Sequence, residues 1–122
     1  MLRINTYISE SVIHGLGLFA AEPVSAGTVI WRFDPPFDVT FVKDTLGVLP
    51  PPARELVEKY AYFEKALNQY VLCGDDARFM NHSTTPNTEE RTRFTIALRD
   101  IKPSEELTCN YESYEIDCSN FR

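Results

Sequence analysis

The sequence has few of the residues that build disulfide frameworks and metal centres. Its three cysteines, Cys73, Cys109 and Cys118, are widely spaced, and its two histidines are His14 and His82. No Cys-x-x-Cys pair occurs, so a tetrahedral zinc site would require distant residues to converge by chance. The odd number of cysteines also argues against a disulfide framework. We therefore expect neither a bound metal nor disulfide bonds.

Long apolar runs and an excess of positive charge are also missing. No apolar stretch approaches the roughly 20 residues that cross a bilayer, and residues 1–6 lack the apolar core of a secretory signal. These absences favour a cytoplasmic protein that does not contact a membrane. The formal net charge of −6 disfavours direct binding to nucleic acid, whose phosphates require a basic surface.

Acidic residues concentrate towards the C-terminal end, where Lys102 is the one base between Asp100 and Asp117. Such a run is usually a solvated face of a domain. It could instead attract a Lys/Arg-rich peptide through its complementary potential. The sequence leaves both interpretations open, and the second would give the protein a basic partner.

Most of the chain has the pattern of short strands separated by turns. Residues 2–8 alternate apolar and polar side chains, and residues 94–98 are rich in apolar and β-branched side chains, as strands are. The same reasoning predicts strands at residues 16–21, 28–31, 70–73 and 106–111. Because the length suits one domain, we expect a single α+β domain over residues 1–122 that is mainly β.

One segment, about 53–67, has the pattern of an α-helix. Leu56, Tyr60, Phe63 and Leu67 fall on one apolar stripe at helical spacing. The prolines just before this segment suit its start, since proline is favoured at the first helical position. No alternation of strand and helix surrounds it, which disfavours a Rossmann-type methyltransferase.

Three further segments carry motifs. Residues 15–20 read Gly-Leu-Gly-Leu-Phe-Ala, residues 78–87 read Arg-Phe-Met-Asn-His-Ser-Thr-Thr-Pro-Asn, and residues 105–111 read Glu-Glu-Leu-Thr-Cys-Asn-Tyr. The first alone is a common glycine turn. The second resembles the Arg-Phe-x-Asn-His-Ser-x-x-Pro-Asn signature of SET-domain protein-lysine methyltransferases, and the third resembles their Glu-Leu-Thr-x-x-Tyr motif. In length the chain is similar to minimal SET domains of the viral and bacterial type.

The resemblance implies the SET β-fold over residues 1–122. This fold has several small sheets, an inserted helix at about 53–67 within an insert of about 44–68, and a short tail at 112–122. It also has a C-terminal pseudoknot, in which the segment with Asn81 and His82 passes through a loop formed by the last motif. Threading is rare in proteins, so this expectation comes from the resemblance alone.

The resemblance also implies S-adenosyl-L-methionine as the cofactor, with the substrate lysine entering a channel from the opposite face. A glycine beside the cofactor would let the backbone approach it closely. The residues expected to bind the cofactor are Leu16, Gly17, Arg78, Asn81, His82 and Tyr111. Those expected to line the substrate channel are Tyr62, Cys109 and Tyr114.

The expected chemistry is a direct displacement, for which the protein supplies alignment and electrostatics. A free lysine has a pKa of about 10.4, so its neutral form costs roughly 4–5 kcal/mol at neutral pH. A narrow apolar channel beside a sulfonium lowers that pKa, so no general base is required. Tyr111 is the expected catalytic residue, although without the motifs it would read as a core tyrosine. Cys109 is smaller than the Phe or Tyr of many relatives, which hints at di- or trimethylation.

The sequence departs from many SET enzymes because it has no zinc module before or after the domain. Cys118 is the one cysteine in the tail, so the channel must be closed by the tail with Phe121 or by a second subunit in a homodimer. The substrate would be a basic, lysine-bearing protein, with histones among the candidates, and action in a nucleus or host cell stays open. The alternatives are a catalytically silent SET module that binds a partner, and a fragment of a larger enzyme.

Overall fold

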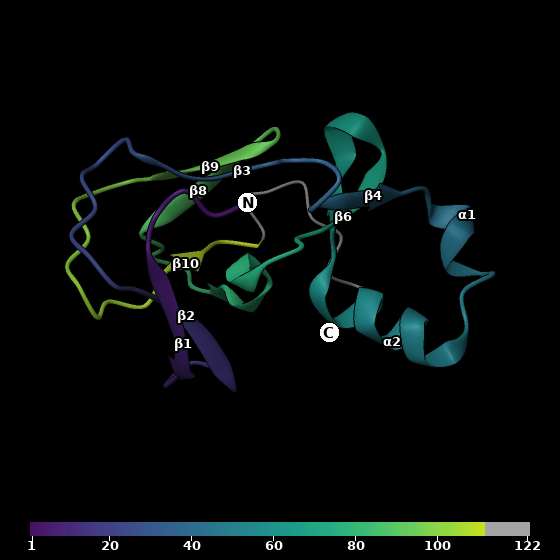
Figure 1. The fold of residues 1–122 in the computed structure, drawn as a ribbon, viewed down its shortest axis with the longest axis horizontal. Helices are drawn as coiled ribbons and strands as arrows, with labels where there is room; N and C mark the ends of the chain where they lie inside the picture. The colour runs from purple at the N-terminus through teal and green to yellow at the C-terminus, as the bar shows by residue number, and fades with distance from the viewer. Residues whose placement is uncertain (112–122) are drawn as a thin grey trace.

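The computed structural model describes residues 1–111. Its strands, α-helices and 3-10 helices (η) are, in chain order, β1 (Thr6–Glu10), β2 (Leu16–Ala20), β3 (Val29–Arg32), β4 (Val39–Phe41), α1 (Lys43–Leu46), α2 (Pro51–Tyr60), β5 (Tyr62–Glu64), η1 (Lys65–Leu67), β6 (Gln69–Leu72), η2 (Asp76–Phe79), β7 (Asn81–His82), β8 (Thr88–Arg91), β9 (Phe94–Ala97) and β10 (Thr108–Cys109). Figure 1 shows the helices α1 and α2 with β4 and β6 on one side and the remaining labelled strands on the other.

The strands form four small sheets. β1 and β2 make an antiparallel hairpin, and two three-stranded antiparallel sheets have the orders β3-β9-β8 and β4-β6-β5. The fourth sheet is the pair β7–β10. The expectation of a mainly β fold built from several small sheets is therefore confirmed.

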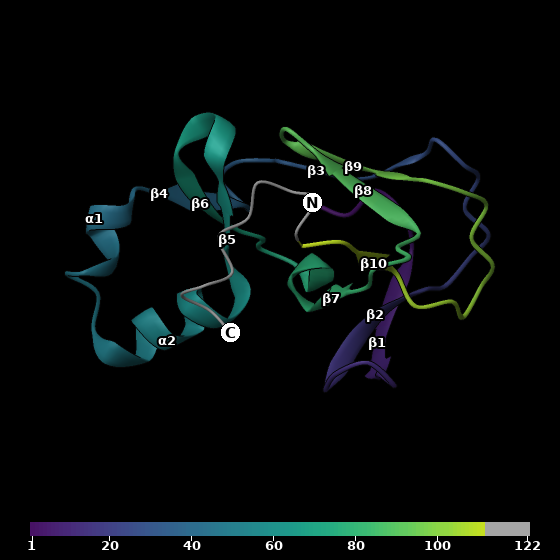
Figure 2. The same ribbon diagram turned by 180° about the vertical axis from the view of Figure 1, so that it is seen from behind.

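The pair β7–β10 is parallel and joins the second motif to the third. Thr108 lies opposite Asn81 and Cys109 lies opposite His82, and Figure 2, in which both strands are labelled, shows them in the middle of the molecule. The Ser83 amide also donates to the Cys109 carbonyl at 2.9 Å. The pair lies where the pseudoknot is expected, and the threading itself stays a prediction.

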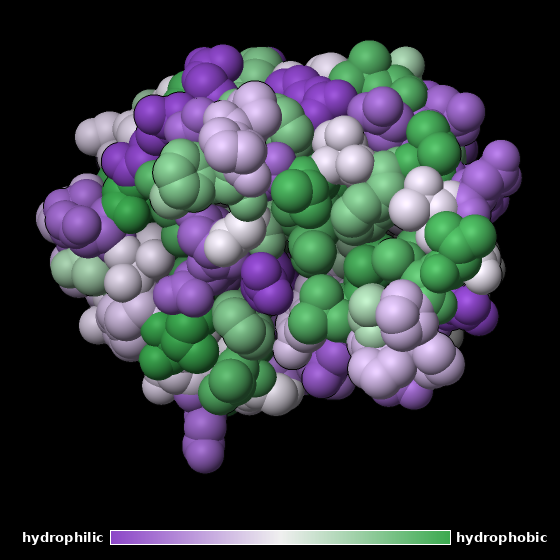
Figure 3. All heavy atoms as spheres, turned by 45° about the vertical axis from the view of Figure 1, so that its right-hand side comes forward, coloured by the Kyte–Doolittle hydropathy of each residue, from purple (hydrophilic) through white to green (hydrophobic). Residues whose placement is uncertain are grey.

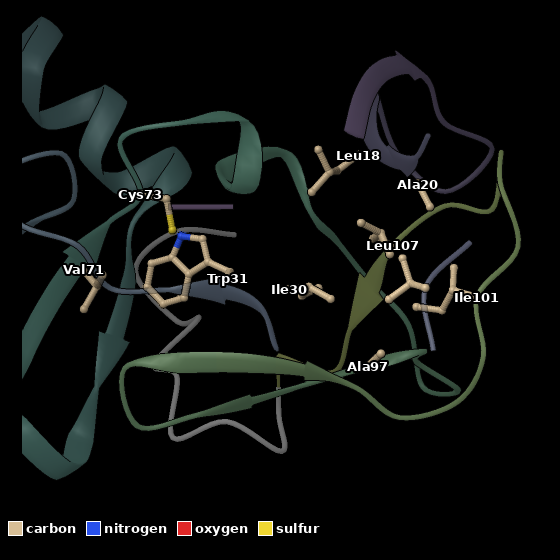
Figure 4. Close-up of a cluster of buried hydrophobic side chains, with 10 residues drawn as sticks. Leu18, Ala20, Ile30, Trp31, Val71, Cys73, Ala97, Ile101 and Leu107 are labelled. Atoms are coloured by element: carbon tan, nitrogen blue, oxygen red, sulfur yellow. The ribbon is translucent and has the colours of Figure 1, made fainter. Parts of the chain in front are cut away.

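Two clusters of buried side chains hold these sheets together. Burying an aliphatic or aromatic side chain of this kind contributes about 1.5–3 kcal/mol. The smaller cluster packs Val57 and Ala61 of the α2 end against Tyr70 of β6. The larger one lies mainly in the strand-rich half and reaches β6 at Val71 (Figure 4). It consists of Leu18, Ala20, Val24, Ile30, Trp31, Val71, Cys73, Ala97, Ile101 and Leu107.

The predicted end of the inserted helix, at about residue 67, is wrong. Helix α2 begins at Pro51 and ends at Tyr60, after which Ala61 is extended and residues 62–64 form β5. Two aromatic residues in succession favour a strand, and Phe63 packs on Tyr70 of the neighbouring strand with ring centroids 5.0 Å apart. The predicted apolar stripe therefore runs over different elements, with Leu56 and Tyr60 in α2, Phe63 in β5 and Leu67 in η1.

The buried face of α2 also differs from the predicted stripe. Val57 is 4% exposed, whereas Leu56 is 42% exposed. Side chains on the α1–α2 side that are exposed and apolar are Phe37, Val39, Val42, Val48, Leu56 and Leu67. Figure 3, in which this side comes forward, shows hydrophobic atoms gathered near the middle of the face.

No helix within residues 1–111 is both long and apolar enough to cross a membrane.

A buried carboxylate connects three backbone segments at the junction of the two halves. Asp38 is 2% exposed. It accepts hydrogen bonds from the backbone amides of Asp34 and Gly74, each at 2.9 Å, and from the amino group of Met1 at 2.8 Å. Because a buried carboxylate is stable only when it is hydrogen-bonded or paired, these contacts fix the position of the chain around Gly74.

Candidate active site

The side-chain amide of Asn81 links the three motifs. Its Nδ2 donates to the carbonyls of His14 and Leu16 at 3.0 and 3.2 Å and to Glu106 Oε2 at 2.9 Å. Asn81 is 7% exposed, and buried polar groups of this kind are costly when unpaired. The glycine turn, β7 and the segment before β10 are thereby held at one point.

Glu106 completes this network from the third motif. Its two carboxylate oxygens accept from Ser11 Oγ at 2.7 and 2.8 Å. The same Ser11 oxygen accepts from the backbone amide of Ile13 at 2.9 Å, which orders the turn between β1 and β2. Sequence reasoning missed Ser11, which has no distinctive neighbour, and assigned no role to Glu106, although Glu106 begins the Glu-Leu-Thr-x-x-Tyr motif.

Gly17 leaves room for the Glu106 carboxylate in its hydrogen-bonded position. A Cβ on Gly17 would lie 2.5 Å from Glu106 Oε2 and 3.1 Å from the Ser11 Cβ. The glycine therefore allows the carboxylate to approach the strand β2, a physical reason that differs from the close approach to a cofactor expected from the sequence. Gly17 is also absent from the lining of the cavity described below.

A second set of buried hydrogen bonds positions β10. Asn87 Nδ2 donates to the Glu106 carbonyl at 2.8 Å, and Asn87 Oδ1 accepts from the Thr108 amide at 2.9 Å. Thr88 Oγ1 donates to the Thr108 carbonyl at 2.7 Å. These bonds attach the third motif, just before Tyr111, to the end of the second motif and to the first residue of β8.

Tyr111 is held at both its backbone and its hydroxyl. Its amide donates to His82 Nδ1 at 3.0 Å, and its hydroxyl donates to the Met80 carbonyl at 2.6 Å. Because Nδ1 of His82 accepts, the ring in this arrangement carries its proton on Nε2. The two rings lie 5.3 Å apart, so His82 acts as a support for Tyr111.

A cavity of about 700 Å³ adjoins Tyr111, where the end of α2, the turn before β2 and the η2–β7 segment meet. This volume lies in the range of small-molecule sites, about 300–1,000 Å³. The cavity is lined by His14, Gly15, Leu16, Lys59, Tyr60, Arg78, Phe79, Met80, Asn81 and Tyr111.

Of the residues expected to bind a cofactor, those that line this cavity are Leu16, Arg78, Asn81 and Tyr111. His82, like Gly17, does not line this cavity. The cavity has apolar walls and a few polar groups, and its volume fits a ligand the size of S-adenosylmethionine. Phe79 and Met80 lie inside the second motif and could have been included by position. Lys59 has no sequence signal, and Tyr60 was predicted as part of the apolar stripe; both reach the cavity through the fold of the inserted helix.

Two of the residues predicted for the substrate channel, Tyr62 and Cys109, do not line this cavity. The Tyr62 hydroxyl donates to Glu90 Oε1 at 3.0 Å, at the junction of two sheets. Cys109 is buried in β10 opposite His82, and Tyr114 lies outside the described residues. No group of His, Cys, Asp and Glu that could hold a metal occurs within residues 1–111.

Glu90 is a half-buried acid that does not line this cavity. It also accepts from Thr95 Oγ1 at 2.7 Å. Burial raises the pKa of Glu90 to about 7, opposed by the hydrogen bonds from Thr95 and Tyr62 and reinforced by the nearby charge of Glu64. Burial, together with the charge of Glu90, also raises the pKa of Tyr62. The folded state therefore favours a protonated Glu90.

We expect the free energy of unfolding to fall as the pH rises from about 4.5 to about 7, because the unfolded chain loses the Glu90 proton first. The effect is on the order of 2–3 kcal/mol. Glu90→Gln, which is neutral at every pH, should flatten this part of the profile and raise stability at about pH 8. Urea denaturation across the pH range measures it. Glu89→Gln is the control, because that side chain is 41% exposed beside Arg91. Equal slopes for wild type and Glu90→Gln would contradict the assignment.

The comparisons with known proteins agree with this geometry. A sequence model of the SET domain matches residues 15–112. Histone-lysine N-methyltransferase 2D of Homo sapiens is 28% identical over 120 residues, covering 88% of this chain and 2% of the relative. A histone-lysine N-methyltransferase of Kluyveromyces lactis, named as H3 lysine-4 specific, is 30% identical over 125 residues, covering 85% of this chain and 11% of the relative. The chain therefore spans a small part of these relatives.

A comparison with solved structures gives the same result for the fold. The structure of an inhibitor-bound, humanized mutant of the Chaetomium thermophilum Polycomb Repressive Complex 2 superimposes with a TM-score of 0.68 and 25% identity, covering 91% of this chain and 15% of the other. The family match extends over most of the chain and includes all three motifs that meet at Asn81. The chain belongs to the SET domain family.

Proposed function

We propose that the protein transfers a methyl group from S-adenosylmethionine to a lysine side chain of another protein. The observation that carries this proposal is the convergence of Asn81 and Tyr111 on one cavity of about 700 Å³. Relatives named as histone-lysine N-methyltransferases support the reaction type. A basic protein such as a histone suits the net charge of −6.

Leu16, Arg78, Asn81 and Tyr111 would hold the cofactor, which supplies an electrophilic methyl group on a sulfonium. Gly17 and His82 act through others: the first gives Glu106 room beside Asn81, and the second receives the Tyr111 amide. Alignment of reacting atoms by such fixed groups can remove several kcal/mol of the barrier, and about 7–11 kcal/mol for a well-oriented pair.

Tyr111 is the proposed catalytic residue. Because its hydroxyl hydrogen is used by the Met80 carbonyl, the oxygen lone pairs can face positive charge in the cavity. An oxygen held in this way stabilises and orients the charge on the reacting groups, and does not need to remove a proton. The fixed hydrogen bond means that no reorganisation is required during the reaction.

The residues beside Tyr111 also favour a neutral amine. Leu16, Phe79 and Met80 make part of the wall apolar, and Lys59 and Arg78 add positive charge. Desolvation and like charge both lower the pKa of an incoming lysine. We retain Tyr62, Cys109 and Tyr114 as proposed channel residues, with the small Cys109 side chain leaving room for di- or trimethylation. A second subunit closing the channel, and a cytoplasmic or nuclear site of action, also stay proposals.

The proposal is tested with tritiated S-adenosylmethionine on an array of lysine peptides, with arginine in place of lysine in a matched set. We expect label on lysine peptides alone, most strongly on basic ones. Calorimetry with S-adenosylhomocysteine separates the outcomes. Binding without transfer to any peptide or to core histones would favour the silent module, and absence of both would reject the proposed cofactor.

A further inference from the structure

The end of helix α2 brings a lysine into the cavity. Lys59 and Tyr60 are the last two residues of α2, and both line the cavity together with Arg78 of η2. Helix α2 lies outside the three motifs in the sequence. None of the described residues that line the cavity is acidic, although the chain as a whole has a net charge of −6. This wall is therefore positive in an acidic protein.

Tyr60 holds the two cations near one another. Lys59 Nζ lies 5.3 Å and Arg78 Cζ lies 5.7 Å from the centre of its ring. The ring of Phe79 packs against it edge-on at 5.5 Å, which fixes its orientation. An aromatic face attracts a cation without supplying an oxygen acceptor, so the N–H donors of both side chains remain available to a ligand.

Neither cation has a carboxylate partner within residues 1–111, where the ion pairs involve other residues. Lys59 is exposed and Arg78 is half-buried. An anion that enters the cavity would meet two positive groups at once. Charge-assisted hydrogen bonds of this kind are shorter and roughly twice as strong as neutral ones.

We propose that Lys59, together with Arg78, binds the α-carboxylate of S-adenosylmethionine, with Tyr60 as a positioning residue. This inference rests on the proposed function, because it takes the cofactor as the ligand of the cavity. The α-carboxylate, with a pKa of about 3.3–3.7, is the one anionic group of that molecule at neutral pH. The inserted helix thereby contributes a contact that the motifs do not supply.

The test compares two probes that differ in one charge: S-adenosylhomocysteine and its carboxamide. We expect Lys59→Met to weaken binding of S-adenosylhomocysteine about tenfold in calorimetry and to leave the carboxamide nearly unchanged. Lys59→Arg should restore most of the affinity because it keeps the charge. Lys65→Met is the matched control, since Lys65 is exposed on η1 and does not line the cavity.

Unchanged binding of S-adenosylhomocysteine to Lys59→Met, or an equal loss for both probes, would overturn the proposal. If the carboxamide binds none of the variants measurably, the affinities of Lys59→Met and Lys59→Arg for S-adenosylhomocysteine decide the test. A loss of affinity in Lys59→Met that Lys59→Arg does not restore would contradict the proposal. Because the readout is binding, a protein that binds S-adenosylhomocysteine but methylates nothing would still test this contact. Absence of all binding to the wild type would reject the proposed cofactor and this contact together.

Discussion

Tyr111→Phe should reduce the rate of lysine methylation about 100-fold, the loss typical of removing one polar group that stabilises charge in a transition state. The variant keeps the ring that packs beside His82 and the backbone amide that donates to its Nδ1. It removes the hydroxyl of a residue that lines the cavity, together with its hydrogen bond to the Met80 carbonyl. Single-turnover rates with saturating cofactor measure the effect on the chemical step.

The fold should tolerate this change. Loss of one hydrogen bond costs about 1 kcal/mol, so the midpoint of thermal unfolding should fall by only a few degrees, roughly 3–6 °C. Affinity for S-adenosylhomocysteine should stay within about threefold of the wild type, a change of less than about 1 kcal/mol in binding free energy. Tyr7→Phe is the control, since Tyr7 stacks on Phe19 in the β1–β2 hairpin and does not line the cavity. A Tyr111→Phe enzyme as fast as the Tyr7→Phe enzyme would remove Tyr111 from the catalytic step.

The meeting of the three motifs could be predicted from the sequence, and the reason they meet could not. Asn81 and Tyr111 belong to segments whose order resembles a known family, so both could be named in advance. Of the partners that fix them, Ser11 lies outside every motif, and Glu106 begins the third motif but has no role that its residue type alone reveals. Their importance comes from a shared hydrogen-bond network, which is a property of tertiary structure.

The strands show the same division. Strands with apolar side chains, such as β3 and β9, were predictable because burial leaves a pattern. Strand β8 reads Thr-Glu-Glu-Arg and was not predicted, since its polar side chains suggest a loop. It is a strand because it pairs with β9 and because Glu90 finds Tyr62 and Thr95 as donors. Pairing partners decide such strands, and a local pattern does not contain them.

Gly74→Ala should be the most destabilising of the substitutions considered, lowering the free energy of unfolding by about 3 kcal/mol or more. A Cβ at this position would lie 1.8 Å from the Phe37 carbonyl oxygen and 2.7 Å from its carbon. Both are backbone atoms, so a side-chain rotation cannot relieve the overlap. The Gly74 amide also donates to Asp38, and separating the two segments would lengthen that bond to a buried carboxylate.

Gly47→Ala separates this overlap from the general effect of replacing a glycine. A Cβ on Gly47 would make an ordinary contact at 3.6 Å with the Asp44 carbonyl, and its backbone is right-handed helical with φ of −67°. That variant should be neutral or more stable by up to about 1 kcal/mol, because alanine has less freedom in the unfolded chain. Urea denaturation of both variants gives the difference. Equal stabilities would mean that the two backbones around Asp38 can move apart at little cost, and the junction between the two halves would then be looser than its hydrogen bonds indicate.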